Sequence, residues 1–302
     1  TIKWGITGSD TIGKGIGSYV KYDPAYIYNS GMQTFEILKS PQVVELIYST
    51  SNAIQNAANA HKSDDEDIAD DALDKAGLFQ FCSFPQIDYD FTKTCSLDLT
   101  MADHDFITDH ILKAKACQGT LLRWLVDNPQ TTLPEEFEHL RNCHLPEELA
   151  YLQDLAQRFA DFMYMVHVRY NYIYSGYQDE EVLEKFKQLL DAYRNSGTDM
   201  DTVLAAVNIR ENSGKLFCKE IAQHVADGET EKNGLLDQTI INRERRVKGS
   251  RRKIGNPAYK YDKKNRIHYY KLTFRWKTVR QFMEELRAAS SHSTMGKEAT
   301  NG

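Results

Sequence analysis

Apolar residues recur three and four positions apart along most of the chain, which is the spacing of helices that pack on one face. The longest apolar stripe lies in residues 146–175 and is wide enough to form the centre of a helical body. Its members are Leu152, Leu155, Phe159, Phe162, Met163, Val166, Tyr170 and Ile173. The same spacing predicts a helix after Pro41, a helical pair between 101 and 127, and helices over 134–142, 179–194, 199–210, 215–225 and 277–289. We therefore predict a mainly α-helical protein.

Local signals mark several ends of these helices. Thr100 followed by Asp103 resembles a capping box, in which the two residues satisfy each other's backbone N–H groups. Gly119 interrupts the apolar spacing of the 101–127 region and predicts two helices or a bent one. Gly176 is placed to end the long helix as a C-cap, because glycine adopts the left-handed conformation without strain.

One C-terminal segment alternates apolar and polar residues, which predicts a strand. Ile267, Tyr269, Lys271, Thr273 and Arg275 would line one face, and His268, Tyr270, Leu272, Phe274 and Trp276 the more apolar other face. The predicted fold is therefore a multi-helix body with a small α+β basic C-terminal part.

Changes in composition predict the domain boundaries. Seven acids among the eleven residues 64–74 indicate a solvated linker, and Phe79, Phe81 and Phe84 follow it as a short strand or an apolar strap. The predicted regions are an N-terminal helical segment (1–63), the acidic linker and aromatic strap (64–99), the helical body (100–236), the basic α+β segment (237–289) and a disordered tail (290–302). The chain starts without Met, so we expect the N-terminal segment to continue upstream.

Composition favours a soluble cytoplasmic protein. The 302 residues are 41% hydrophobic and 26% charged, and no apolar run approaches the roughly 20 residues that span a bilayer. No signal peptide is visible, and five cysteines, an odd number without metal-finger spacing, fit a reducing compartment better than a disulfide framework. We predict no membrane partner.

Three stretches carry weak signals of chemistry, each with a more ordinary interpretation. Residues 11–20 are rich in glycine but lack the Lys-Ser/Thr ending of a phosphate-binding loop. Cys143 and His144 need distant ligands to form a zinc site, and His167 with Arg169 is either a catalytic pair or a buried histidine beside a rim arginine. We predict no metal, no cofactor and no catalytic residue.

Charge is distributed very unevenly. Residues 243–280 hold fifteen Lys and Arg against two acids, a balance of +13; since the chain carries −6, the remainder carries −19. Each cation that neutralises a phosphate releases a condensed counterion, and aromatic side chains can stack on unpaired bases. The predicted nucleic-acid-binding residues are Arg243, Arg245, Arg246, Lys248, Arg251, Arg252, Lys253, Tyr269, Tyr270 and Trp276.

Other functions of this basic segment stay open. It could cover the acidic body through internal salt bridges, or dock a protein partner and make the chain an adaptor. A nuclease is a further alternative, with its site upstream of Thr1, because the sequence contains no persuasive nuclease constellation.

The run RERRVKGSRRKIGNP, followed by FRWKTVRQFMEEL, resembles the C-terminal signature of an uncharacterised bacterial domain family, RERR-x-KG … RW-x-x-VR. The stretches PAYIYNSGMQTFEI and LTMADHDFITDHILKAKACQGTLLRWLVDN, and the helix ending VRYNYIY, are similar to other parts of that family. The resemblance implies a bacterial cytoplasmic protein whose gene lies near helicases and nucleases in phage-defence neighbourhoods. It implies no established activity. We thus expect a non-enzymatic, nucleic-acid-associated component of a bacterial defence or DNA-processing system that binds DNA or RNA, with a helicase or nuclease subunit as partner.

Overall fold

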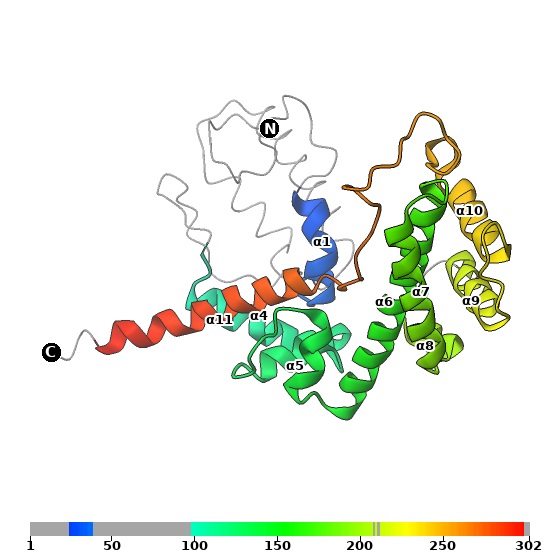
Figure 1. Ribbon diagram of the computed structural model, residues 1–302. Helices are drawn as coiled ribbons and strands as arrows, with labels where there is room; N and C mark the ends of the chain where they lie inside the picture. Colours follow the sequence, from blue (N-terminus) through cyan, green and yellow to red (C-terminus); the bar gives the residue numbers. More distant parts are fainter. Residues whose placement is uncertain (1–23, 39–97, 208, 210–211, 299–302) are drawn as a thin grey trace, which may run out of the picture. The chain divides into compact units, whose positions relative to one another are not determined.

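The computed structural model describes residues 24–38, 98–207, 209 and 212–298, and these residues are mainly helical (Figure 1). The elements are α1 (Pro24–Thr34), α4 (Met101–Lys113), η2 (Lys115–Cys117), α5 (Leu121–Asp127), η3 (Phe137–Cys143), α6 (Glu147–Tyr174), α7 (Glu180–Asn195), α8 (Met200–Ala206), α9 (Asn212–Ala226), α10 (Leu235–Lys248), η4 (Gly249–Arg251) and α11 (Trp276–Glu298), where η marks a 3₁₀ helix.

The chain folds as two compact units. The described residues up to 130, together with those from 282 onward, form the first unit, and residues 131–281 form the second. The second unit thus contains most of the predicted helical body and most of the predicted basic segment.

In the first unit, the predicted helical pair is confirmed as α4 and α5. The capping box is present: the Thr100 side chain accepts from the Asp103 N–H, and the Asp103 carboxylate accepts from the Thr100 N–H at 2.8 Å. Gly119 has a φ of 67°, in the left-handed region that favours glycine, and it lies where the chain turns between the two helices.

The second unit is built around α6, which packs against α7, α8 and α10. The predicted stripe supplies its core, with Phe159, Phe162 and Val166 all buried, although Leu152 near the start of the helix is exposed. Gly176, with a φ of 67°, follows the end of α6 as predicted. These contacts fix the positions of the helices that support the basic segment.

Two predicted helices are shorter in the structure. The 134–142 segment becomes helical only at Phe137 and then forms a 3₁₀ helix, η3. The 199–210 segment ends as α8 at Ala206, because Val207 has an extended backbone conformation.

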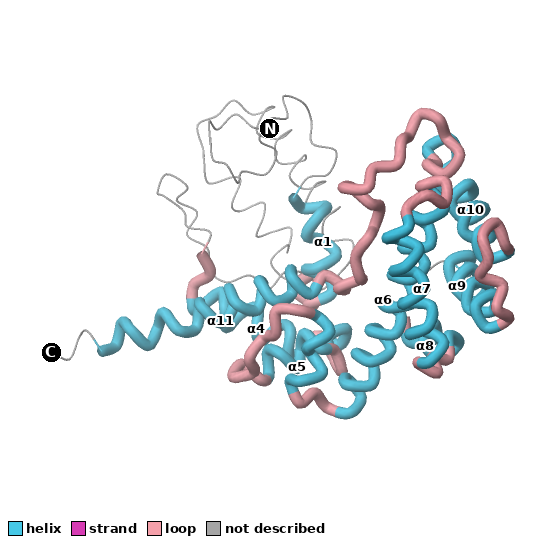
Figure 2. The backbone as a smooth tube through the Cα atoms, viewed as in Figure 1, coloured by secondary structure: helices cyan, strands magenta, loops and turns pink. Residues whose placement is uncertain are grey.

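The predicted strand over 267–276 is wrong. Residues 252–275 form a long loop (Figure 2), and the described residues include no strand with which this segment could pair. Positive φ values at His268, Phe274 and Arg275 also interrupt the extended backbone that a strand requires. The small α+β part is therefore not present among the described residues, and the alternation of side chains has another origin.

A side chain of α6 takes the role that a neighbouring strand would have had. The Asn171 amide nitrogen donates to the Ile267 carbonyl oxygen at 2.8 Å, and the Asn171 amide oxygen accepts from the Ile267 N–H at 2.9 Å. Asn171 is fully buried, and Tyr269 and Leu272 pack against the helical core. Individual side-chain contacts, rather than the hydrogen bonds of a neighbouring strand, thus hold the loop on the helices.

Several predictions lie outside the described residues. These are the glycine-rich stretch 11–20, the helix after Pro41, the acidic linker 64–74 and the aromatic strap through Phe84. At the other end, α11 continues to Glu298, past the predicted end of the closing helix. Within the described residues, no helix combines the length and apolar character that crossing a bilayer requires.

Candidate nucleic-acid interface

Helix α10 changes character along its length. In its first turns Leu236 and Ile240 are buried in the core, and the buried Asp237 carboxylate accepts from the Arg169 guanidinium of α6, with Nη2 and Oδ2 3.0 Å apart. Its last turns and η4 leave the core and carry exposed cations. We call four of them the exposed cluster: Arg245, Arg246, Lys248 and Arg251.

The exposed cluster has no acidic partner in the described part of the chain. The Arg245 guanidinium lies 3.5 Å from the Asn242 amide oxygen, and none of the four residues forms an ion pair with a described residue. The C-terminal end of a helix carries a partial negative charge that favours cations, but it balances only a fraction of four positive charges. The cluster therefore presents uncompensated positive charge to solvent.

Glu244, the only acid within the run 243–253, is engaged elsewhere. Its carboxylate accepts from the Tyr170 hydroxyl at 2.6 Å, from the Lys253 N–H at 2.8 Å and from the Ile254 N–H at 3.1 Å. Burial and the hydrogen bond to Glu244 raise the pKa of Tyr170 above its usual range. These three bonds fix the backbone after η4 and leave the exposed cluster unneutralised.

The remaining predicted cations of this run lie closer to the protein. The Arg243 guanidinium donates to the Ser213 hydroxyl at 3.0 Å and lies 5.8 Å from the centre of the Phe217 ring. Arg252 and Lys253 are half-buried, and the Lys253 ammonium lies 5.9 Å from the centre of the Tyr259 ring. Sequence reasoning did not select Tyr259, whose ring is partly exposed beside these cations.

The three predicted stacking aromatics are placed very differently. Tyr270 is 61% exposed, whereas Tyr269 is half-buried with its ring edge toward Tyr164. Trp276 is 3% exposed, and its indole N–H donates to the Pro134 carbonyl oxygen at 3.0 Å. A buried ring is not accessible to a base, so Trp276 is a packing residue rather than part of an open interface.

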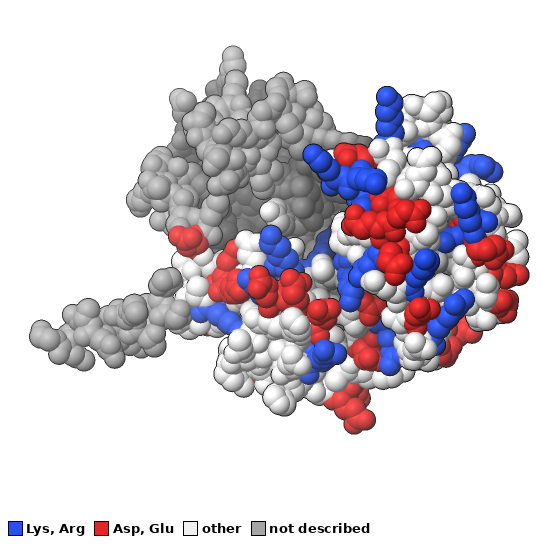
Figure 3. Space-filling model, in the orientation of Figure 1, with Lys and Arg blue, Asp and Glu red and all other residues white. Residues whose placement is uncertain are grey.

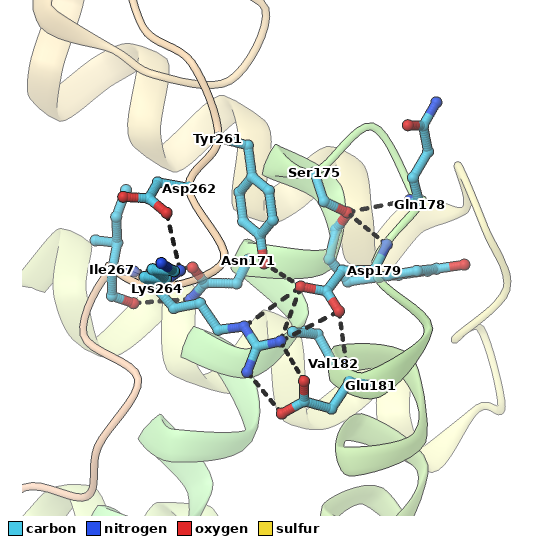
Figure 4. Close-up of polar contacts among 12 residues, drawn as sticks. Asn171, Ser175, Gln178, Asp179, Glu181, Val182, Tyr261, Asp262, Lys264 and Ile267 are labelled. Atoms are coloured by element: carbon cyan, nitrogen blue, oxygen red, sulfur yellow. Dashed lines mark hydrogen bonds and ion pairs between the residues drawn. The ribbon is translucent and has the colours of Figure 1, made fainter.

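Two of the later cations of the basic segment, Arg266 and Lys271, are paired with acids of the helical body, whereas Lys260, Lys263 and Lys264 are exposed and form no ion pair with a described residue. We call residues 260–272 the paired loop. In it the Arg266 guanidinium donates to Asp179, with Nη2 and Oδ2 3.0 Å apart, and to Glu181, with Nη2 and Oε2 2.8 Å apart (Figure 4). The Tyr261 hydroxyl also donates to the Asp179 carboxylate, which is fully buried. Burial alone would raise the pKa of Asp179, but the hydrogen bonds from Tyr261 and Arg266 outweigh it and hold that pKa below its usual value.

A second cation of the paired loop also has acidic partners, but this pair lies close to solvent. The Lys271 ammonium lies 2.8 Å from an Asp161 carboxylate oxygen and 3.4 Å from one of Glu138. Pairing of this kind matches the sequence-based alternative of an internal salt-bridged cover. On the face drawn in Figure 3, Lys and Arg side chains are interspersed with Asp and Glu side chains.

His167 and Arg169 lie in different surroundings, and Arg169 differs from the rim position expected for it. The Arg169 guanidinium is buried in its ion pair with Asp237 rather than at a rim. Burial lowers the pKa of His167 to about 4, so its imidazole is neutral at pH 7. Its Nδ1 has no hydrogen-bond partner among the described residues.

No metal centre emerges in the described part of the chain. Its residues contain no group of three or more His, Cys, Asp or Glu side chains that could hold an ion. The Cys143 thiol points to the Thr132 carbonyl oxygen at 3.6 Å, and burial raises the pKa of that thiol.

The sequence signals for this arrangement were unequal. A density of Lys and Arg was enough to find the exposed cluster, but nothing in one sequence indicates that Asn171 binds the backbone of Ile267.

Comparison with protein-family models, with curated protein sequences and with solved structures finds no match for this chain.

Proposed function

We propose that this chain binds the phosphate backbone of nucleic acid through the exposed cluster and catalyses no reaction on it. The observation that carries the proposal is the density of unpaired charge at the end of α10: four exposed cations within seven residues form no ion pair with a described residue. Cations without a protein counter-charge are the ones that can exchange phosphate counterions, which is the main source of non-specific affinity.

Rigid mounting supports the same function. The buried Arg169–Asp237 pair ties α10 to α6, and the bonds to Glu244 hold the backbone that follows η4. Cations on such a support can meet phosphates without a large loss of backbone entropy.

Contacts of this type position a nucleic acid but do not read its sequence. Tyr270 and Tyr259 are exposed aromatic rings of the same basic segment and offer stacking surfaces to unpaired bases. We therefore expect affinity to depend on charge and salt and little on sequence. The resemblance of the basic segment adds the expectation of a helicase or nuclease partner in a bacterial defence or DNA-processing system.

Fluorescence anisotropy with labelled single- and double-stranded DNA and RNA tests the proposal at about 50 and 200 mM salt. For each phosphate bound on a duplex, the slope of log K against log salt should change by about −0.9. Replacing Arg245, Arg246, Lys248 and Arg251 by Gln should weaken binding alike for different sequences and flatten this slope by about 1 for each phosphate that is no longer neutralised.

A matched control variant distinguishes the loss of the binding site from a general effect of net charge. The variant Arg245→Gln/Arg246→Gln should weaken binding, whereas Arg141→Gln/Lys187→Gln, which removes the same charge from exposed positions outside the basic segment, should leave it nearly unchanged. Equal losses in the two doubles, or no binding at low salt, would overturn the proposal. Capture of an acidic protein partner that is lost in the first double, with no nucleic acid bound, would instead favour the adaptor.

A further inference from the structure

A cavity of about 710 Å³ lies next to the exposed cluster, within the second unit. Its wall is formed by residues of α6, α9, α10 and η4, by two residues of the paired loop, and by Ile209 and Lys253. The apolar part of the wall includes Phe159, Met163, Val166, Phe217, Ile240 and Val247. The volume falls within the range of roughly 300–1,000 Å³ that is typical of small-molecule sites.

The polar groups of the wall are mostly engaged by the protein itself. Glu244 accepts from Tyr170 and from two backbone N–H groups, and Arg243 donates to Ser213. The His268 Nδ1 lies 3.2 Å from the Tyr270 hydroxyl. His167 Nδ1 is the one buried polar atom of the wall without a partner among the described residues.

The shortage of free polar groups in the wall limits the chemistry of the ligand portion that could enter the cavity. A nucleobase has several donors and acceptors on its edges, and most of them would lose their water without gaining a protein partner. A hydrocarbon body has no such groups and gains from leaving water against this wall. The interior therefore favours an alkyl chain over a base.

The charged residues at the rim of the cavity determine which chemical group the other end of the ligand can carry. Lys248, Arg251 and Lys253 line the cavity, and Lys248 and Arg251 form no ion pair with a described residue. Glu244, the only acid among the described residues of the wall, is held by its three donors. An anionic head at this rim would meet two cations that the protein leaves uncompensated.

We propose that the cavity binds a single-chain amphiphile, free in solution, with an apolar body and a phosphate- or carboxylate-like head. The chain lies against Phe159, Val166 and Phe217, and the head contacts Lys248 and Arg251. Binding of such an amphiphile goes beyond the proposed nucleic-acid binding, and the two sites overlap at Lys248 and Arg251.

Isothermal titration calorimetry with octyl phosphate, octanol and inorganic phosphate tests the proposal on the full chain. Octyl phosphate should bind at least about tenfold more tightly than either octanol or inorganic phosphate, because it alone satisfies both the wall and the rim. The variant Lys248→Gln/Arg251→Gln should lose about tenfold in affinity for octyl phosphate and keep its affinity for octanol.

Two further variants separate local contacts from general effects. Arg245→Gln/Arg246→Gln removes the same charge from residues that do not line the cavity, so its affinity for octyl phosphate should match the unmodified chain within about twofold. Val247 is 51% exposed, so a Val247→Trp change can fold and fill the mouth, and it should abolish binding of both octyl compounds.

Absence of octyl phosphate binding, equal losses in the two double variants, or equal affinity for inorganic phosphate would overturn the site. Binding of anionic phosphatidylglycerol vesicles without uptake of octyl phosphate would also overturn it, in favour of a membrane surface. The Arg245→Gln/Arg246→Gln variant should bind nucleic acid more weakly and keep its affinity for octyl phosphate, so failure of this site and failure of the proposed function are distinguishable.

Discussion

Both halves of the basic segment are rich in Lys and Arg, but only the second half contains cations that pair with acids of the helical body. In the exposed cluster, Arg245, Arg246, Lys248 and Arg251 form no ion pair with a described residue. In the paired loop, Arg266 binds Asp179 and Glu181, and Lys271 binds Asp161 and Glu138. A count of Lys and Arg cannot separate these halves, because the difference lies in acids that are distant in the sequence.

This difference assigns different physical roles to equal charges. A cation whose charge is already balanced by a buried carboxylate fastens a loop to the body and has little to offer a phosphate. A cation exposed at a helix end contributes little to folding and remains available for a ligand. The comparison therefore predicts that the paired loop matters for stability and the exposed cluster for binding.

The largest effect should come from Asp179→Ala. This change leaves the Arg266 guanidinium and the Tyr261 hydroxyl without their buried acceptor and removes the side chain that caps α7 at the Val182 N–H. We expect a loss of about 3 kcal/mol in the free energy of unfolding, the low end for a broken buried pair, since Glu181 still accepts from Arg266. Urea unfolding followed by circular dichroism at 222 nm measures it.

Glu181→Gln is the matched control for this prediction. The Glu181 carboxylate binds the same guanidinium but is 74% exposed, so its loss should be clearly smaller. Equal effects of the two changes would mean that burial does not distinguish the pairs, and the account of the paired loop would fail.

The next effect should come from Asn171→Ala. The Asn171 side chain is fully buried and is the only described partner of both the N–H and the carbonyl oxygen of Ile267. Removing it leaves these groups unpaired and should cost about 1–3 kcal/mol in the free energy of unfolding. Hydrogen exchange should then show faster exchange of the Ile267 amide than in the unmodified protein.

The exposed Asn142→Ala change serves as its control and should alter neither measurement. If exchange at Ile267 stays slow in the Asn171 variant, the loop is held by its packed side chains alone. The role of Asn171 as a replacement for a strand partner would then be wrong.

A smaller effect should appear in the pH dependence of stability. The folded-state pKa of Asp179 is below its unfolded value, so its pairing stabilises the fold above about pH 4 and loses this effect as the pH falls through the folded pKa. Asp179→Asn lacks this contribution at every pH. Its free energy of unfolding should therefore fall less than that of the unmodified protein between about pH 7 and pH 3, as urea titrations at both pH values would measure.

If the free energy of unfolding of both proteins falls by the same amount on acidification, carboxylates other than Asp179 cause the pH dependence of stability. Glu181 also has a pKa below its usual value because of Arg266, and it is present in both proteins. The difference between the two titrations thus reports the contribution of Asp179 together with the effect of its charge on the pKa of Glu181.

Local signals in the sequence predicted the helices well. The capping box at Thr100, the break at Gly119 and the stop at Gly176 each depend on a few neighbouring residues, and all three are present. The alternation over 267–276 failed because a strand depends on a pairing partner, and here the backbone at Ile267 pairs with a side chain 96 residues away. Structure that depends on distant contacts left no local trace.

The same limit applies to the candidate site. The position of the cation-rich run was evident from composition, but its division into exposed and paired halves depended on Asp161, Asp179 and Glu181 of the helical body. Trp276 seemed equivalent to Tyr270 in the sequence, yet the contact with Pro134 buries the Trp276 ring. Which cations and rings face solvent is decided by tertiary packing.

The smallest effect on stability should come from Arg245→Gln/Arg246→Gln. Both side chains are exposed and form no ion pair with a described residue, so the small attraction to the helix end that they lose is offset by relief of repulsion within the exposed cluster. We expect the free energy of unfolding to change by less than about 0.5 kcal/mol in urea titrations at about 100 mM salt. A loss above about 1 kcal/mol would show that these arginines support the fold, and the contrast with the paired loop would disappear. An unchanged free energy together with weaker nucleic-acid binding would assign their charge to the ligand alone.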